Sequence, residues 1–145
     1  YPVHLSPSVQ AAAKEILGDH DRIHLIAPLD VFDFHNLASR SYFIMSDSGG
    51  VQEEAPSLGK PVLVLRDTTE RPEGVKAGTL KLVGTDPDKV KEAMTSLLTE
   101  EALYKEMSEA PNPYGDGKAS ERIVQAIKVY FNLEDSVLEF HEGGN

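Results

Sequence analysis

The sequence has 145 residues, no cysteine and a formal net charge of −10 at pH 7. A chain of this length can bury a hydrophobic core, and its composition, 40% hydrophobic and 26% charged, is typical of a soluble globular protein. The negative charge argues against a nucleic-acid-binding surface, because polyanions bind basic patches. The lack of cysteine excludes a disulfide scaffold and a thiolate metal site. No apolar stretch approaches the roughly 20 residues of a membrane-spanning helix.

Short apolar segments alternate with helical patterns along the chain. Four segments, each bounded by Gly, Pro or Asp, predict strands: residues 23–26, 42–45, 62–65 and 80–83. Helical patterns lie around them, over residues 9–17, 30–39, 51–58 and 87–98, from residue 99 onward, and from about residue 116 onward.

Local signals mark the ends of several helices. Gly18 and Gly59 follow the first and third helix, as expected for C-cap glycines. Asp86 and Pro87 predict an N-cap and a first helical residue. The last helix places four apolar residues on one face: Ile123, Val124, Ile127 and Phe131. The tail, residues 133–145, has no clear period, so we expect it to be disordered unless a partner surface holds it.

This alternation predicts an α/β fold in which helices cover both faces of a parallel sheet. Open sheets of this kind bind ligands at the carboxyl ends of their strands. The segment Ser46–Gly50, with the sequence SDSGG, follows the second predicted strand and lies at such an end. It is therefore the first candidate for a binding site.

The turn has a composition suited to a diphosphate. Gly49 and Gly50 remove two Cβ atoms, so backbone N–H groups can approach an anion at the positive end of the helix dipole. Ser46 and Ser48 add hydroxyl donors. The alternative is a plain tight turn in which Asp or Ser caps the helix, and the glycines alone do not decide between the two. No lysine follows in the register of a Walker loop.

Two adjacent carboxylates, Glu53 and Glu54, lie about one helical turn beyond the glycines. A carboxylate at that position can accept hydrogen bonds from both ribose hydroxyls, as acidic residues do in dinucleotide-binding folds. Compensation of the helix dipole, worth about 0.3–1 kcal/mol per carboxylate, explains one of the two without a ligand. It does not explain why a pair follows a Gly-Gly turn.

Residues 46–74, SDSGGVQEEAPSLGKPVLVLRDTTERPEG, strongly resemble the non-hydrolysing UDP-N-acetylglucosamine 2-epimerases. Three further motifs are similar to the same family: YPVH at 1–4, AGTLKLVGTD at 77–86 and NPYGDGKASERI at 112–123. The resemblance implies a Rossmann-like parallel sheet flanked by helices, one half of a GT-B-type two-domain enzyme with its active site between the domains. On this interpretation residues 1–132 are the C-terminal UDP-binding domain of a longer enzyme, as the missing initiator Met also indicates, and the tail inherits no role.

The resemblance also implies roles for particular residues. Ser48, Gly49 and Gly50 would cradle the diphosphate, and Glu54 would bind the ribose. Phe34 matches the position that packs against uracil. The alternative for Phe34 is an ordinary core phenylalanine on a short helix.

Further implied contacts come from other segments. The region of Leu29 would hold the edge of the base with backbone groups, and His4 matches a histidine near a second, allosteric UDP-sugar site. Arg71 and Glu70, in the loop after the third predicted strand, would face the substrate cleft, where Arg71 suits a phosphate or a glutamate. The alternative is an exposed loop whose charges neutralise one another.

The family inverts C2 of the sugar without oxidation, by eliminating UDP to give 2-acetamidoglucal and adding UDP back. The resemblance places its catalytic residues in the N-terminal part, so we expect none within these 145 residues, and we expect no cofactor and no metal. The expected partners are UDP-N-acetylglucosamine or UDP, the enzyme's own N-terminal domain and a second subunit of a homodimer, in the cytoplasm. Neither nucleic acid nor membrane is expected.

Two alternatives stay open. A retaining GT-B glycosyltransferase would use the same phosphate and ribose contacts, although the TTERPEG loop favours an epimerase. A free-standing nucleotide-sugar-binding module would bind the same ligand without chemistry.

Overall fold

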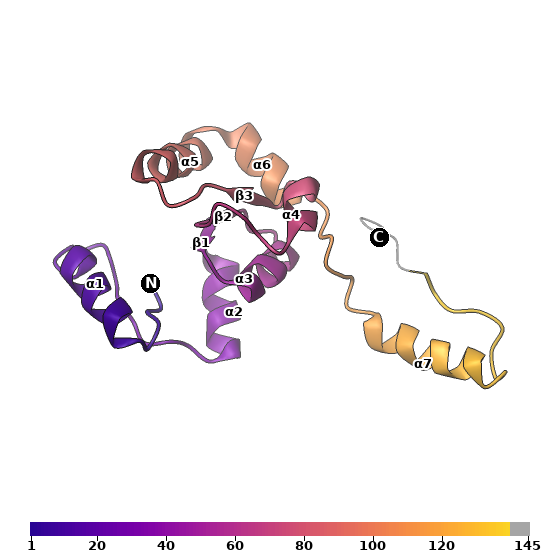
Figure 1. Cartoon of the computed structure of the whole chain (residues 1–145). Coiled ribbons are helices and arrows are strands. Elements are labelled where there is room, and N and C mark those ends of the chain that lie inside the picture. Colours follow the sequence, from indigo (N-terminus) through magenta and orange to yellow (C-terminus); the bar gives the residue numbers. More distant parts are fainter. Residues whose placement is uncertain (140–145) are drawn as a thin grey trace. The chain divides into compact units, whose positions relative to one another are not determined.

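A computed structural model describes residues 1–139 of the chain (Figure 1). The chain forms two compact units, Tyr1–Leu37 and the part from Ala38 onward, and each is described by itself. The predicted boundary between a domain over residues 1–132 and a tail stays a prediction. The last six residues of that tail lie outside the described residues.

The first unit contains a short parallel pairing between the beginning of the chain and the first apolar segment. Pro2 forms an isolated parallel bridge with Ile26, and the N–H of Val3 donates to the Ile26 carbonyl at 2.9 Å. The next hydrogen bond of such a ladder would need an N–H from Pro28, which has none. The strand predicted over residues 23–26 is therefore reduced to a single bridge.

Helix α1 (Pro7–Leu17) confirms the first predicted helix and starts two residues earlier, with proline in its first turn. Gly18 follows it in a right-handed conformation, with φ of −69°. The predicted end of the helix at Gly18 is confirmed, although glycines at this position more often adopt a left-handed conformation. Helix α2 (Val31–Arg40) confirms the second predicted helix and crosses the boundary between the two units.

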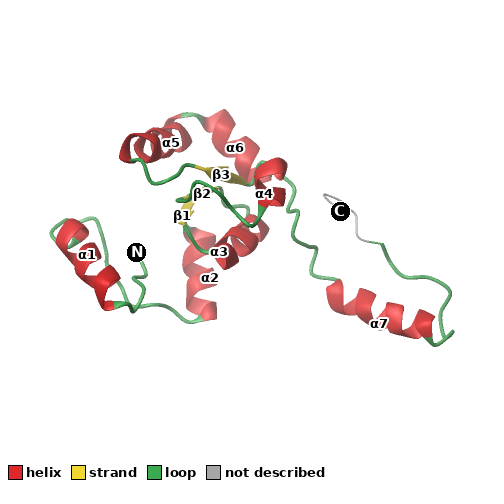
Figure 2. Cartoon of the chain, in the orientation of Figure 1, coloured by secondary structure: helices red, strands yellow, loops and turns green. Residues whose placement is uncertain are grey.

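The sheet of the second unit has three parallel strands in the order β1-β2-β3. They are β1 (Ile44–Ser46), β2 (Val62–Val64) and β3 (Leu80–Leu82). Figure 2 shows these short strands between the helices of the unit. The prediction for β1 began two residues too early, because Tyr42 and Phe43 precede the ladder, which starts where Ile44 pairs with Val62.

The helices of the second unit follow in chain order: α3 (Gly49–Glu54), the 3₁₀ turn η1 (Ala55–Leu58), α4 (Pro72–Ala77), α5 (Pro87–Thr99), α6 (Glu101–Glu109) and α7 (Ala119–Tyr130). The third predicted helix is thus divided into α3 and η1. It ends at Gly59, whose φ of 64° is left-handed, as expected for a C-cap glycine. The predicted N-cap Asp86 is confirmed, since its carboxylate accepts from the N–H groups of Asp88 and Lys89.

Helix α4 was not predicted, because residues 69–73 were interpreted as a loop. Its six residues are too few to display a helical apolar period. Two terminal signals were nevertheless present. Pro72 occupies the first helical position, and Gly78 closes the helix with a left-handed φ of 86°.

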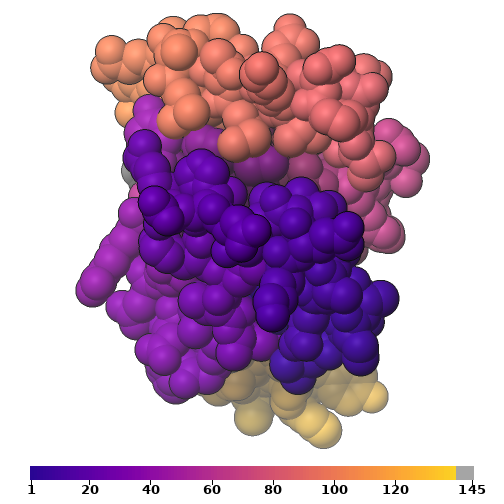
Figure 3. Space-filling model, turned by 90° about the vertical axis from the view of Figure 1, so that its left-hand side faces the viewer, coloured from indigo at the N-terminus to yellow at the C-terminus, as the bar shows by residue number. Residues whose placement is uncertain are grey.

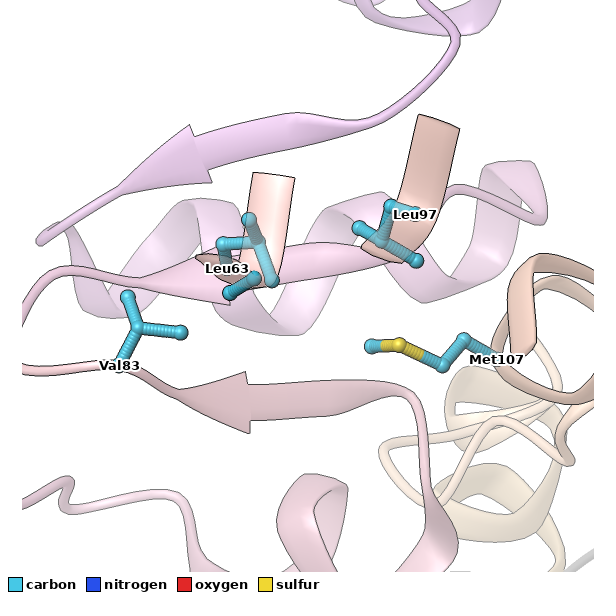
Figure 4. Packing of buried hydrophobic residues seen from close by; sticks show 5 residues of the cluster. Leu63, Val83, Leu97 and Met107 are labelled. Atoms are coloured by element: carbon cyan, nitrogen blue, oxygen red, sulfur yellow. The ribbon is translucent and has the colours of Figure 1, made fainter. Parts of the chain in front are cut away.

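One face of the sheet is covered by α5 and α6, which pack side by side (Figures 1 and 3). Figure 4 shows the apolar cluster on this face, in which Leu63 of β2 and Val83 lie with Leu97 of α5 and Met107 of α6. Leu63 is fully buried and Leu97 nearly so. These helices therefore fix the sheet from one side.

The opposite face of the sheet packs against the segment that follows β1. Val62 and Val64 alternate with Leu63 along β2 and form a second cluster with Ala55 of η1 and Leu80 of β3. Because β2 is buried on both faces, the predicted Rossmann-like parallel sheet flanked by helices is confirmed. The segments that follow the carboxyl ends of β1 and β2 carry the candidate site.

Helix α7 ends in a left-handed cap. Asn132 has φ of 54°, and the N–H groups of Asn132 and Leu133 donate to the carbonyls of Val129 and Lys128, as in a Schellman motif. Leu138 then donates its N–H to the side chain of Gln125, so the described part of the tail contacts α7. The predicted apolar face of this helix is 51–63% exposed within residues 1–139.

Candidate functional site

The SDSGG turn joins the end of β1 to the start of α3. The Ser46 hydroxyl accepts the N–H of Ser48 at 3.1 Å, which holds the turn together. Ser48 stands at the N-cap with extended backbone angles, yet its side chain makes no capping hydrogen bond. The simpler interpretation, in which a serine is kept here to cap the helix, therefore has no support from Ser48.

The two glycines of the turn are not required by contacts within the described structure. A Cβ on Gly49 would lie 3.8 Å from Nη2 of Arg71, and a Cβ on Gly50 would lie 3.9 Å from Oγ of Ser48. Both are ordinary van der Waals distances. Because glycine in a helix costs roughly 1 kcal/mol relative to alanine, a molecule that approaches the backbone would account for their presence.

Gly74 shows the contrasting case. A Cβ at Gly74 would lie 2.5 Å from Cδ1 of Leu80 and would overlap the hydroxyl of Tyr114. Packing alone therefore demands glycine at this position. The comparison separates a glycine that the fold needs from the two in the turn that it does not.

Arg71 reaches the turn from the loop after β2. Its Nε donates to Oε1 of Glu53, and its Nη2 is the atom nearest to the empty Cβ position of Gly49. Its Nη1 also donates to the Glu70 carbonyl at 3.2 Å. Arg71 thus pairs with a glutamate and places a positive charge beside Gly49, and its predicted contact with a phosphate stays a prediction.

Glu70, a predicted contact residue, forms an ion pair with Arg66. Its two carboxylate oxygens accept from Nη1 and Nη2 of Arg66 at 2.7 and 3.0 Å. Its own backbone N–H, followed by Arg66, lowers the pKa of the Glu70 carboxyl. The alternative of mutually neutralising loop charges describes this pair well, and a role for Glu70 in substrate binding stays a prediction.

Glu53 and Glu54 have different surroundings. Glu53 is half-buried and paired with Arg71, whereas Glu54 is exposed. Oε1 of Glu54 lies 4.0 Å from the position that a Cβ on Gly50 would occupy, so this carboxylate stands over the second glycine. The assignment of the ribose to Glu54 stays a prediction, with Glu53 already engaged by the arginine.

Gln52 is a site residue that the sequence analysis missed. Its side chain is completely buried. Its Nε2 donates to the Ser48 carbonyl at 3.2 Å, and its Oε1 accepts from the Thr69 hydroxyl at 2.6 Å. The signal in the sequence was a polar residue two positions after a Gly-Gly pair. The sequence analysis assigned the polar role in this helix to the adjacent glutamates instead.

Tyr114, from the NPYGDG motif, contacts the start of α4. Its hydroxyl donates to the Arg71 carbonyl at 3.5 Å, and burial raises its pKa. The motif thus supports the segment that carries Arg71, a placement that its sequence did not reveal.

The remaining predicted contact residues belong to the first unit. Leu29 and Phe34 are half-buried, and the Phe34 ring lies 6.0 Å from the ring of His35. Nδ1 of His4 accepts the N–H of Ser6 at 3.1 Å. The proximity of these three residues to a nucleotide stays a prediction.

Residues 1–139 contain no group of three His, Asp or Glu side chains placed to hold a metal ion. Within the same range, no helix is long and apolar enough to cross a membrane.

The parallel sheet, with a glycine turn and an arginine at the carboxyl ends of its strands, defines the chain as a Rossmann-like α/β protein with a candidate anion site. The family model for UDP-N-acetylglucosamine 2-epimerase matches residues 1–128. The chain therefore belongs to the UDP-N-acetylglucosamine 2-epimerase family, and the resemblance seen in its motifs is confirmed.

Individual relatives support this assignment. The chain is 64% identical over 131 residues to the UDP-N-acetylglucosamine 2-epimerase of Bacillus subtilis (strain 168), which covers 90% of this chain and 34% of the relative. The S. aureus MnaA–UDP co-structure is 61% identical with a TM-score of 0.90, over 97% of this chain and 39% of that one. The Neisseria meningitidis UDP-GlcNAc 2-epimerase bound to UDP-GlcNAc is 51% identical with a TM-score of 0.83, over 87% and 34%.

The chain thus spans between a third and two fifths of the length of these relatives. The activity in their names therefore belongs to proteins that are about two and a half to three times as long as the segment aligned with this chain.

Proposed function

We propose that this chain is the UDP-binding part of an enzyme that interconverts UDP-N-acetylglucosamine and UDP-N-acetylmannosamine. The observation that carries the proposal is the 0.90 TM-score, at 61% identity, to a relative solved with UDP. The glycines of the SDSGG turn, which no contact in residues 1–139 requires, support the same ligand. The match to an epimerase family model over residues 1–128 favours this function over a glycosyltransferase.

The turn supplies the diphosphate contacts in this proposal. Backbone N–H groups at Gly49 and Gly50 donate to phosphate oxygens, and the exposed hydroxyl of Ser48 adds a further donor. Arg71 lies beside the first glycine and contributes a fixed positive charge. Glu54 accepts from the ribose hydroxyls, while Phe34 and the backbone near Leu29 receive the base.

The chemistry explains why a UDP-holding part is needed. A base removes the C2 proton of the sugar as the C1–O bond breaks, and the bond electrons leave with UDP to give 2-acetamidoglucal. UDP then adds back to C1 after C2 is protonated on the other face. Because the C2 proton is weakly acidic, its removal depends on a stabilised leaving group, and preorganised donors beside Arg71 stabilise the departing diphosphate.

The groups that move the proton belong, in this proposal, to an N-terminal domain outside these 145 residues. Closure of that domain over the site retains the glucal between elimination and re-addition. The intact enzyme is a cytoplasmic homodimer on this interpretation, and His4 contributes to an allosteric UDP-sugar site.

Calorimetric titration of the chain with UDP tests the proposal directly. We expect saturable binding of one UDP per chain, and weaker binding of uridine, which lacks the diphosphate. Absence of UDP binding by a folded chain would contradict the proposal.

A further inference from the structure

The buried amide of Gln52 is satisfied at both ends. Its side chain has 0% exposure, and a primary amide without hydrogen-bond partners is costly to bury. Here Nε2 donates to the carbonyl of Ser48 and Oε1 accepts from the hydroxyl of Thr69. The residue is therefore held by two specific partners from two different loops.

The hydrogen bonds continue beyond Thr69. The same Thr69 hydroxyl that donates to Gln52 accepts the backbone N–H of Arg71 at 3.0 Å. The chain of donors thus runs in one direction, from Arg71 through Thr69 and Gln52 to the carbonyl of Ser48. Hydrogen bonds aligned in this way polarise and strengthen one another.

This chain of hydrogen bonds fixes two parts of the candidate site relative to each other. The carbonyl of Ser48 also accepts the backbone N–H of Gln52, so two donors hold the carbonyl edge of the planar Ser48–Gly49 peptide. The N–H of Gly49 is trans to that carbonyl and must point away from Gln52. At the other end, the Thr69 hydroxyl holds the backbone of Arg71, whose guanidinium lies beside Gly49.

We propose that Gln52 is a positioning residue, which sets the backbone of the SDSGG turn and the guanidinium of Arg71 at the spacing that a diphosphate requires. This proposal rests on the proposed function of the turn. The turn and Arg71 contact the ligand. Gln52 itself is buried behind them.

The test breaks the chain of hydrogen bonds at two separate links. Gln52→Met keeps the length and volume of the side chain and removes both amide bonds, and Thr69→Val keeps the shape of threonine and removes its hydroxyl. We expect each variant to lose about tenfold in affinity for UDP. The double variant should lose little more than either single one, because both act through the same connection.

A matched control separates positioning from general loss of stability. Thr79 is the other buried polar residue in residues 1–139 and donates its hydroxyl to the Gly74 carbonyl. Thr79→Val should lower the melting temperature of the chain and leave UDP affinity within about twofold of the unchanged chain. Inorganic pyrophosphate should lose affinity in the Gln52 and Thr69 variants by the same factor as UDP, because the diphosphate contacts alone are disturbed.

The outcomes distinguish the two proposals. If the unchanged chain fails to bind UDP, the proposed function fails and the role of Gln52 fails with it. If the unchanged chain binds UDP and Gln52→Met or Thr69→Val binds it equally well, only the positioning role is overturned. Should Gln52→Met not fold, Thr69→Val alone decides, since it leaves the amide and its bond to Ser48 in place.

Discussion

Arg71 donates from Nε to the carboxylate of Glu53, whereas the neighbouring Glu54 is exposed and stands over Gly50. Consecutive residues of a helix point about 100° apart, so the two carboxylates cannot serve one ligand atom in the same way. Glu53 acts on the site through the arginine. The proposed function assigns the ribose to Glu54.

The first prediction separates the two carboxylates. Glu54→Gln would remove the proposed charge-assisted hydrogen bond to the ribose and should weaken UDP binding by roughly tenfold to hundredfold, with little effect on inorganic pyrophosphate. Glu53→Gln keeps an acceptor for Arg71, so it should change UDP affinity less and should affect pyrophosphate equally. Calorimetry with both ligands measures this, and a larger UDP-specific loss in the Glu53 variant would exchange the two roles.

The second prediction concerns the glycines. Gly50→Val should abolish detectable UDP binding while circular dichroism shows a retained fold, because a side chain has room at this position but would meet the diphosphate. Gly50→Ala should stabilise the chain by up to about 1 kcal/mol in the absence of ligand.

Gly74→Ala is the control for the glycine prediction. Its Cβ would meet Leu80 at 2.5 Å, so it should destabilise the chain by about 1–3 kcal/mol. Unchanged UDP affinity in a folded Gly50→Val variant would make the SDSGG segment a plain turn.

The sequence predicted those parts of the fold that are encoded by local patterns. The strands around Val62 and Leu80 and the caps at Gly59 and Asp86 follow from apolar runs and single cap residues. The strand expected near Ile26 is only a single bridge, because strand pairing depends on the partner segment as well as on the apolar pattern. Pro28 has no N–H to continue the pairing.

The site was predictable only in part, for a related reason. The SDSGG turn and the arginine loop stood out by composition and were found together. Gln52 did not stand out, because its importance comes from Thr69, seventeen residues away in sequence. The division of labour between Glu53 and Glu54 likewise depends on where Arg71 points, which no sequence spacing determines.

The third prediction concerns activity. The 145-residue chain should bind UDP and yet show no interconversion of UDP-N-acetylglucosamine and UDP-N-acetylmannosamine, because the proposed proton-transfer groups lie outside it. Proton NMR of the sugar resonances over a day measures the conversion. The same preparation should bind UDP by calorimetry, which excludes misfolding as the cause. Sustained turnover would place the acid and base within these residues.

The fourth prediction concerns the ion pair at the start of α7. Both carboxylate oxygens of Asp116 accept from Arg122, at 2.8 and 2.7 Å. The Arg122 guanidinium, followed by the backbone N–H of Lys118, holds the pKa of the Asp116 carboxyl well below its ordinary value of 3.8. A carboxyl whose pKa is depressed in the folded state stabilises that state above its unfolded pKa, and the stabilisation is lost as pH falls through the folded pKa.

Asp116→Asn should therefore lower the melting temperature at neutral pH. The difference from the unchanged chain should be constant from pH 7 to about pH 5 and should shrink as pH falls below 4, because the carboxyl of the unfolded chain is then protonated while the native carboxyl stays ionised, and asparagine does not titrate. Thermal unfolding followed by circular dichroism across this range measures the difference.

The exposed ion pair Lys105–Glu109, with a separation of 3.9 Å, provides the control. Glu109→Gln should change the melting temperature little at any pH, since exposed pairs contribute at most about 1 kcal/mol. A difference for Asp116→Asn that persists unchanged to pH 2 would show that the carboxylate charge does not stabilise this end of the helix.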